Sequence, residues 1–304
     1  MILIILLYAL FGASFPMGKV LLHYTTPLFL AGSRMFLAGL VLLAYQYFHT
    51  HAEFKFKRKH IFYYAQIIFC GIYMAYILRF WALSELTATK TCFIYNLSPF
   101  FASLYSYLFF KEVITSKQWL GLIIGFCGFI PILLNTSSTE QAAGEFFFLS
   151  WYEIAVIGSV ALHSYSWIVM RKLVKDKSYE PPMVNGITMT AGGLLSLITS
   201  VFWDGFAPVS DVMPFLGYLT GVIIISNIIC FNLYGHLLRY YTATFVSFAG
   251  FMGPLFTAFY GWFFLEESVT WHFYISAAIV FLGLYLFYQD ELSSTNKERE
   301  EPIP

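Results

Sequence analysis

The chain has few charged side chains for its length. Only 11% of its 304 residues are Asp, Glu, Lys or Arg and 59% are hydrophobic, whereas roughly a quarter of a typical soluble chain is charged. So few charges cannot cover the surface of a soluble protein of this size. The 17 basic and 17 acidic residues also cancel, which excludes the basic footprint of a nucleic-acid-binding protein. The composition predicts a polytopic membrane protein that has the lipid bilayer as its partner.

Cysteine and catalytic motifs are also scarce. The four cysteines fall inside apolar runs without a CxxC or Cys/His spacing, so we expect small core residues and neither a metal nor another cofactor. HExxH, GxSxG and an Asp pair with metal spacing are absent, which argues against a membrane enzyme and leaves no catalytic residue to name. The apolar run 2–22 is too long for a cleavable signal peptide and lacks a basic segment before it.

Long apolar runs are what the chain has instead. A helix needs about 20 mostly apolar residues to cross the hydrocarbon core. Because the runs are continuously apolar rather than alternating, they predict helices and not an outer-membrane barrel. Ten runs qualify, and the predicted class is an all-α protein with ten transmembrane helices. The runs are 2–22, 27–47, 61–83, 88–110, 117–134, 152–173, 182–202, 213–238, 242–264 and 271–288.

The positions of Lys and Arg predict the orientation of these helices. If both termini are cytoplasmic, 13 of the 17 basic residues lie on the cytoplasmic side, eight of them in the connection 48–60 and in the connection 174–181 with the helix end that precedes it. The opposite connections 135–151, 203–212 and 265–270 carry acidic residues and no base. Cytoplasmic connections are the ones enriched in Lys and Arg, so we expect both termini in the cytoplasm, with the charged tail 289–304 disordered there.

An internal repeat divides the chain. A shift of 155 positions places residues 83–133 on 238–288 without a gap, and 14 of 51 positions are identical. Pro99 then falls on Pro254, and Glu112 on Glu267. Five helices per repeat is an odd number, so the second copy must enter the membrane upside down, as in secondary carriers. We expect repeats at 1–134 and 152–288, joined by an external linker at 135–151.

Several short motifs resemble the EamA repeat. The motif-bearing segments are Leu10-Phe11-Gly12-Ala13-Ser14-Phe15-Pro16, Trp81-Ala82-Leu83, Thr87-Ala88-Thr89, Leu97-Ser98-Pro99, Lys111-Glu112, Trp119-Leu120-Gly121 and Gly125-Phe126-Cys127-Gly128. The resemblance covers residues 1–288. One departure is Phe11, at a position where the family often has Trp. It implies the ten-helix drug/metabolite transporter superfamily, whose members carry many different substrates.

Ionisable residues within the spans are the first candidates for function, because they are costly to insert. No Asp or Glu falls in the middle of a span, which disfavours proton coupling through a carboxylate relay and favours exchange or facilitated flux. His163 and His236 remain alternative protonation sites.

Four bases fall towards the external ends of the first four helices, namely Lys19, Arg34, Arg79 and Lys90, and Arg34 is the deepest. They either snorkel to the headgroups or converge on an anionic substrate group, which Arg binds bidentately. The polar and aromatic candidates for substrate binding are Tyr95, Asn96, His163, Trp167 and Asn232. For these five, an interhelical hydrogen bond is an equally good interpretation. Pro99 frees a backbone carbonyl that could line a cavity.

Residues 8–40, the high Phe and Tyr content and the lack of long loops also make the chain similar to the S-adenosylmethionine/S-adenosylhomocysteine transporters of obligate intracellular bacteria. This resemblance implies uptake of S-adenosylmethionine in exchange for S-adenosylhomocysteine across the bacterial inner membrane, by alternating access. Basic residues would bind the carboxylate, and aromatic rings the adenine and the sulfonium. The alternatives are an exporter or facilitator of amino acids or of other amphipathic metabolites or drugs, a membrane enzyme acting on a lipid-linked substrate, and a non-catalytic receptor or assembly subunit. Both a monomer and a homodimer are compatible with the sequence.

Overall fold

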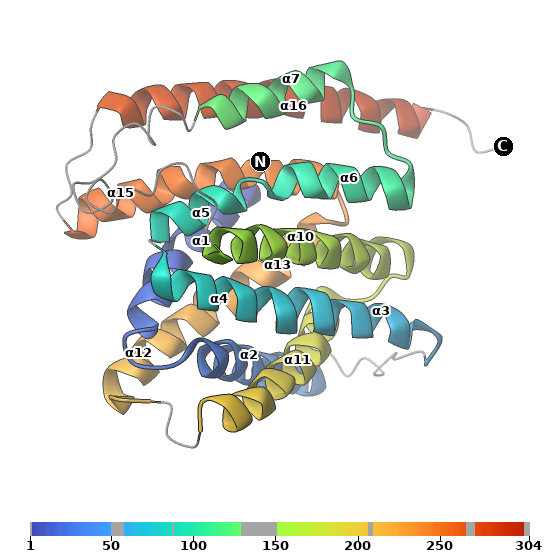
Figure 1. Ribbon diagram of the computed structural model, residues 1–304. Coiled ribbons are helices and arrows are strands. Elements are labelled where there is room, and N and C mark those ends of the chain that lie inside the picture. Colours follow the sequence, from blue (N-terminus) through green and yellow to red (C-terminus); the bar gives the residue numbers. More distant parts are fainter. Residues whose placement is uncertain are drawn as a thin grey trace.

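A computed structural model describes residues 2–49, 58–86, 88–128, 151–205, 209–265 and 271–300. Within these ranges the chain is helical (Figure 1), and the one β contact is an isolated bridge between Thr25 and Val209. The prediction of an all-α fold is confirmed.

The first repeat consists of five spans, of which the third and fourth are composite. The bounds are α1 Ile2–Leu21; α2 Pro27–His49; a third span of η1 Arg58–His60, α3 Ile61–Gln66, η2 Ile67–Met74 and α4 Ala75–Glu85; a fourth of α5 Ala88–Tyr95 and α6 Ser98–Phe110; and α7 Ser116–Cys127.

The second repeat also consists of five spans, and its third and fourth spans are again composite. The bounds are α10 Trp151–Arg171 with η3 Lys172–Asp176; α11 Pro181–Trp203; an eighth span of α12 Val212–Val222, η4 Ile223–Cys230 and α13 Phe231–Leu237; a ninth of α14 Ala243–Phe248, η5 Ala249–Met252 and α15 Gly253–Leu265; and α16 Trp271–Glu300. The described helices thus cover all or part of each of the ten expected spans.

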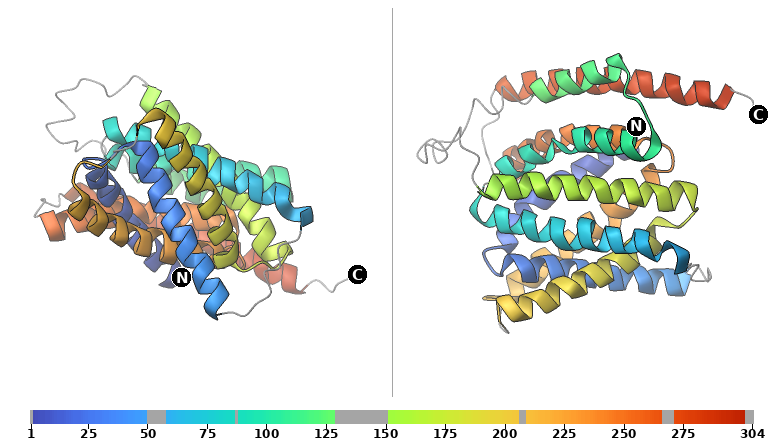
Figure 2. Two further views of the ribbon diagram at one scale, coloured as in Figure 1. Left: turned by 90° about the horizontal axis from the view of Figure 1, so that it is seen from below. Right: turned by 45° about the vertical axis from the view of Figure 1, so that its right-hand side comes forward.

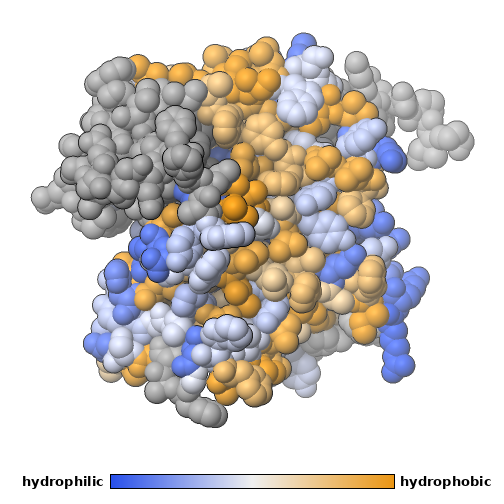
Figure 3. Space-filling view, viewed as in Figure 1, coloured by the Kyte–Doolittle hydropathy of each residue, from blue (hydrophilic) through white to orange (hydrophobic). Residues whose placement is uncertain are grey.

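The outer surface matches a lipid environment. Six of the described helices are long and apolar enough to cross a membrane. Large apolar side chains such as Phe69, Ile198 and Phe281 are about half exposed on that surface. Figure 3 shows the apolar side chains across the middle of one face, with hydrophilic ones towards the helix ends. An apolar band between two polar rims is the surface of a membrane-spanning protein, and the chain is a multi-pass membrane protein.

The two repeats pack against each other through equivalent helices. The second helix, α2, packs along its counterpart α11, and α7 packs along its counterpart α16, so that these pairs lie at opposite edges of the molecule (Figures 1 and 2). Between these pairs, α1 contacts η4 and α15 of the second repeat. Its counterpart α10 makes the equivalent contacts with η2 and α6 of the first repeat. Contacts that are exchanged in this way are expected around a pseudo-twofold axis, which fits two inverted repeats.

Glycines allow the closest of these approaches. A Cβ at Gly121 would lie 2.8 Å from the carbonyl oxygen of Gly283, and one at Gly283 would lie 2.7 Å from that of Gly121. Neither position has room for a larger residue, so α7 and α16 meet backbone to backbone, as small residues permit in membrane helices.

The connections sort to two ends of the molecule. At one end, His60 Nδ1 lies 2.9 Å from the hydroxyl of Tyr179, and Arg239 donates to the carbonyl of Tyr179 at 3.1 Å. At the other, the hydroxyl of Thr26 donates to Asp204 at 2.7 Å. The connections predicted to be basic thus contact one another, and the acidic connection 203–212 contacts the one that joins α1 to α2.

The C-terminal tail and the linker between the repeats are two of the segments predicted to lie outside the membrane spans. Residues 289–300 were expected to be disordered, but α16 continues helically to Glu300, because Glu, Lys and Arg are good helix formers and extend a helix that the membrane span has already nucleated. The predicted linker 135–151 lies outside the described residues except for Trp151, the first residue of α10.

Candidate functional site

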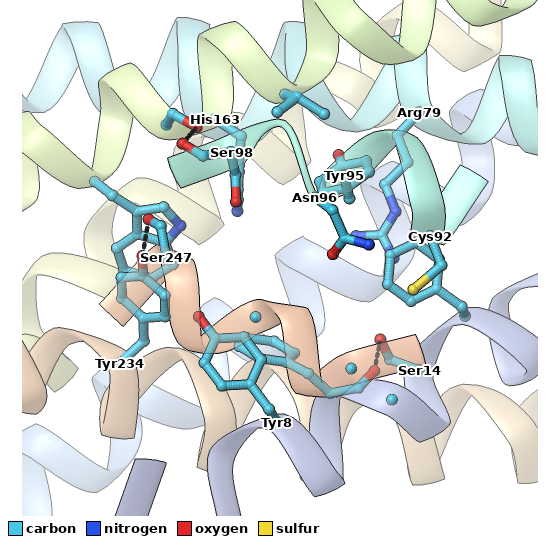
Figure 4. Close-up of a pocket in the computed structure, with 18 of the residues that line it drawn as sticks. Tyr8, Ser14, Arg79, Cys92, Tyr95, Asn96, Ser98, His163, Tyr234 and Ser247 are labelled. Carbon is cyan, nitrogen blue, oxygen red and sulfur yellow. Dashed lines mark hydrogen bonds between the residues drawn. The ribbon is translucent and has the colours of Figure 1, made fainter. Parts of the chain in front are cut away.

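A cavity of about 100 Å³ lies between the two repeats. Its walls come from α1, α4 and the α5–α6 break of the first repeat, and from α10, α13 and the segment from α14 to α15 of the second (Figure 4). A site between inverted repeats is where a carrier binds its substrate.

Two broken helices contribute to this cavity from corresponding positions. The fourth span is interrupted at Asn96 and Leu97, just before Pro99 at the start of α6. The ninth is interrupted over Ala249–Met252, before Pro254. Proline cannot donate the helical hydrogen bond and clashes with the preceding turn, so both breaks follow from the repeated proline. Discontinuous spans in equivalent places of two repeats mark the binding site of many carriers.

The third and eighth spans also deviate from regular helices at equivalent positions. Both contain an eight-residue π-helical stretch, η2 Ile67–Met74 and η4 Ile223–Cys230. The residues that follow them, Tyr76 in the first repeat and Phe231 in the second, line the cavity. π-Helical turns occur frequently at functional sites, because the extra residue per turn changes which side chains face inwards.

Aromatic rings form much of the cavity wall. Trp167 stacks on Tyr234 with ring centroids 4.0 Å apart and an interplanar angle of 25°. The ring of His163 lies edge-on to Trp167 at 5.6 Å and to Tyr76 at 5.8 Å. Apolar faces with a few polar edges suit a planar heterocycle or an organic cation.

Arg79 brings a guanidinium to one end of the cavity. Its Cζ lies 4.3 Å from the ring centroid of Phe15 and 5.0 Å from that of Tyr95. The hydroxyl of Tyr95 lies 2.7 Å from that of Ser159. Asn96 lies at the same helix break, and Figure 4 shows its amide extending into the space beside Arg79. Tyr95 and Asn96 therefore sit beside a fixed positive charge.

Of the three bases of the expected vestibule whose side chains the structure describes, Arg79 alone lines this cavity. The Lys19 ammonium donates to the carbonyls of Leu83, Ser84 and Leu86, at 2.7, 3.1 and 3.0 Å. It therefore caps the end of α4, whose last carbonyls have no partner within the helix. Lys90 belongs to α5, but its side chain lies outside what the structure describes.

Arg34 and Asn232 also have partners away from the cavity. Arg34 is fully buried, and it donates to Asn227 Oδ1 and Ser226 Oγ of η4, both at 2.6 Å. Asn232 accepts from Asn185 at 2.9 Å and donates to the carbonyl of Ile228 at 2.7 Å. For Asn232 the structure supports the interhelical hydrogen bond that was the alternative interpretation, whereas Arg34 neither snorkels to the headgroups nor lines the cavity.

Five of the predicted residues line the cavity together, namely Arg79, Tyr95, Asn96, His163 and Trp167. Sequence reasoning missed Tyr8, Phe231 and Tyr234. The hydroxyl of Tyr8 donates to the carbonyl of Val246, and that of Tyr234 lies 2.9 Å from Ser247 Oγ. The repeat carried a signal for two of them, because its 155-residue register, continued back from residue 83, places Tyr76 on Phe231 and Arg79 on Tyr234.

The ionisable groups around the cavity are of one sign. Among the described residues that line it there is no Asp or Glu. Nor do three or more His, Cys, Asp or Glu side chains cluster as metal ligands anywhere in the described part of the chain. The cavity can therefore offer a substrate a cation, hydroxyls, an amide and aromatic faces.

Comparison with known proteins adds to this geometry. The EamA-like transporter family matches residues 1–134 and 150–289. The S-adenosylmethionine/S-adenosylhomocysteine transporter of Chlamydia muridarum (strain MoPn / Nigg) is 34% identical over 286 residues, which span 93% of this chain and 89% of that protein. The transporter of the same name from Chlamydia trachomatis serovar L2 is also 34% identical, over 93% of this chain and 86% of its own.

A solved crystal structure shares the fold. It aligns with 99% of this chain and 97% of its own chain, with a TM-score of 0.75 and 14% sequence identity. At that identity the likeness shows the common arrangement of helices.

Proposed function

Because the chain belongs to the EamA-like transporter family, we propose that it is a secondary carrier that takes up S-adenosylmethionine in exchange for S-adenosylhomocysteine. Membership makes it a membrane transporter and not an enzyme. The observation that carries the choice of substrate is its 34% identity, over nearly the whole chain, to transporters of that name.

The cavity is chemically compatible with these substrates. Adenine is a planar ring that can stack on aromatic side chains, and a sulfonium is a cation that aromatic faces attract. The Trp167–Tyr234 stack and the ring of His163 supply such surfaces. We assign the adenosine part to this aromatic end of the cavity.

The architecture supports alternating access. The cavity lies between two repeats that meet through a pseudo-twofold set of helix pairs, so rocking one repeat against the other exposes it to either side of the membrane in turn. Because the described lining offers no carboxylate for a proton, we assign the cycle to exchange of one ligand for another.

We place the chain in the bacterial inner membrane with both termini in the cytoplasm. Support comes from the sorting of basic connections to one end of the molecule, where Arg171, Lys172 and Arg239 lie. Fusing a reporter that is active only in the cytoplasm to either terminus tests this orientation. A reporter silent at one terminus but active in the 135–151 connection contradicts it.

Counterflow in proteoliposomes tests the substrate. Vesicles that contain the purified chain are loaded with unlabelled S-adenosylhomocysteine, and uptake of labelled S-adenosylmethionine is followed. We expect uptake well above that of vesicles loaded with buffer. Absence of uptake, together with counterflow of aromatic amino acids in the same vesicles, overturns the assignment and favours an amino-acid carrier of the same fold.

A further inference from the structure

We propose that Arg79 and Asn96 form a subsite for the α-carboxylate of the substrate, and that this subsite makes a free carboxylate a requirement for transport. The inference rests on the proposed function, because it concerns the same cavity. It adds the chemical group that the cavity selects, and it holds for any amino-acid-bearing substrate.

The first evidence is a pair of donors that are buried without a partner. Arg79 and Asn96 are only 6% and 4% exposed. Arg79 Nε and Asn96 Nδ2 have no hydrogen-bond partner among the residues that the structure describes. Leaving a buried donor unpaired costs about 1–3 kcal/mol, and more for a charged group. Both residues line the cavity (Figure 4), where a ligand can supply the missing acceptors.

The second evidence is the charge of this end of the cavity. The guanidinium groups of Arg34 and Arg79 both lie over Tyr76, at 5.5 and 5.6 Å from its ring centroid. Arg34 is held in place by Asn227 and Ser226, so its charge stays fixed behind that ring. Two cations beside a cavity whose described lining holds no carboxylate attract an anion. A carboxylate is the anion of matching shape, because its two oxygens accept from a guanidinium and an amide together.

The third evidence is an asymmetry between the repeats. In the 155-residue register, continued back from residue 83, Arg79 corresponds to Tyr234, and both residues line the cavity. One repeat thus places a guanidinium on the cavity wall where the other places an aromatic ring. The cavity therefore has a polar end and an aromatic end, and it holds an asymmetric substrate in one orientation. The carboxylate lies towards α4 and the α5–α6 break, and the ring system lies towards Trp167 and Tyr234.

Competition by analogues tests the requirement. Unlabelled compounds compete with labelled S-adenosylmethionine for counterflow through the full-length carrier. We expect S-adenosylhomocysteine to compete well, while decarboxylated S-adenosylmethionine and methylthioadenosine compete about 10- to 100-fold more weakly, as the loss of a charge-assisted hydrogen bond implies. Equal competition by the decarboxylated analogue overturns the proposal.

Substitutions then assign the requirement to the two residues. Arg79→Gln and Asn96→Asp should each strongly weaken the binding of S-adenosylmethionine. Each should also reduce the carrier's preference for S-adenosylmethionine over its decarboxylated analogue. Arg79→Lys, which keeps the charge but loses the fork of donors, should restore part of that preference. Arg239→Gln is the matched control, because Arg239 pairs with Glu180 outside the cavity at 3.1 Å. An Arg79→Gln variant that folds and keeps the full preference overturns the assignment.

A binding experiment separates this proposal from the proposed function. Thermal stabilisation of the purified carrier is measured with phenylalanine and phenethylamine, and with tryptophan and tryptamine. If S-adenosylmethionine is not transported, stabilisation by the acids and not by the amines, lost in Arg79→Gln, still supports the carboxylate subsite. Equal stabilisation by acids and amines, in a carrier that does transport S-adenosylmethionine, rejects the subsite alone.

Discussion

Arg171 and Glu112 form a bidentate ion pair between the two repeats. The guanidinium at the end of α10 donates to both carboxylate oxygens of Glu112, beyond the end of α6, at 2.8 and 2.7 Å. Arg171 is 4% exposed and Glu112 34%. The pair lies among the basic connections at one end of the molecule, where it holds the two repeats in contact.

Glu112→Gln should loosen that end of the carrier. The ion pair is partly exposed, so its contribution to stability should lie between that of an exposed and that of a buried pair, at about 1–3 kcal/mol. Its loss should therefore shift the equilibrium between the conformation closed at this end and the one open at this end by about 5- to 150-fold. Cys92, which is buried and lines the cavity, reports on access in a variant whose other cysteines are serine. We expect a charged thiol reagent to label Cys92 faster from the side on which Arg171 lies.

Glu180→Gln is the control for this experiment. Glu180 also pairs with an arginine, Arg239, at 3.1 Å, but both residues belong to the second repeat. Its loss should leave the labelling of Cys92 unchanged. If both variants label Cys92 equally fast, the Arg171–Glu112 pair has no special part in closing the cavity.

Trp167→Ala should weaken the binding of S-adenosylmethionine and of S-adenosylhomocysteine to a similar degree. Trp167 stacks on Tyr234 at 4.0 Å, and losing an aromatic stacking partner reduces affinity by about 2- to 10-fold beyond the area lost. Trp167→Phe should recover most of the affinity. The measurement is the KM for labelled S-adenosylmethionine, with Trp119→Ala, a half-exposed residue of α7, as the control. An unchanged KM in Trp167→Ala contradicts the placement of adenosine.

Lys19→Gln should destabilise the carrier without changing its affinity. The ammonium caps three carbonyls at the end of α4, and its loss leaves these acceptors partly unsatisfied, at about 1–3 kcal/mol. We expect a lower Tm of the purified protein and the same KM, whereas Lys117→Gln on the exposed surface of α7 changes neither. A raised KM at unchanged Tm would return Lys19 to the substrate site.

Arg34→Ala should also act mainly on stability. It removes two hydrogen bonds between α2 and η4 and leaves Asn227 Oδ1 and Ser226 Oγ without that donor, which predicts a loss of about 2–4 kcal/mol. The amount of folded protein should fall together with transport. Abolished transport by protein of normal abundance and Tm would instead show that Arg34 contacts the substrate.

The sequence predicted the helices well because the bilayer demands long apolar runs. It predicted the importance of Pro99 because a proline in a span must interrupt the backbone. It did not separate Arg79 from Lys19 and Arg34. All three are bases near the outer ends of spans, and their roles depend on what faces them: a helix end for Lys19, an amide and a hydroxyl for Arg34, and the cavity for Arg79. Such partners come from distant segments, and one sequence does not place them.

The absence of an acidic side chain from the described lining of the cavity has an electrical consequence. At neutral pH S-adenosylmethionine carries one net positive charge and S-adenosylhomocysteine none, and the lining has no carboxylate to release a proton in compensation. Each exchange then moves one charge inwards. A membrane potential, inside negative, contributes about 2.3 kcal/mol per charge per 100 mV, an accumulation of about 50-fold. Voltage rather than a pH gradient should drive the carrier, and a potassium diffusion potential across proteoliposomes should accelerate uptake at equal pH on both sides.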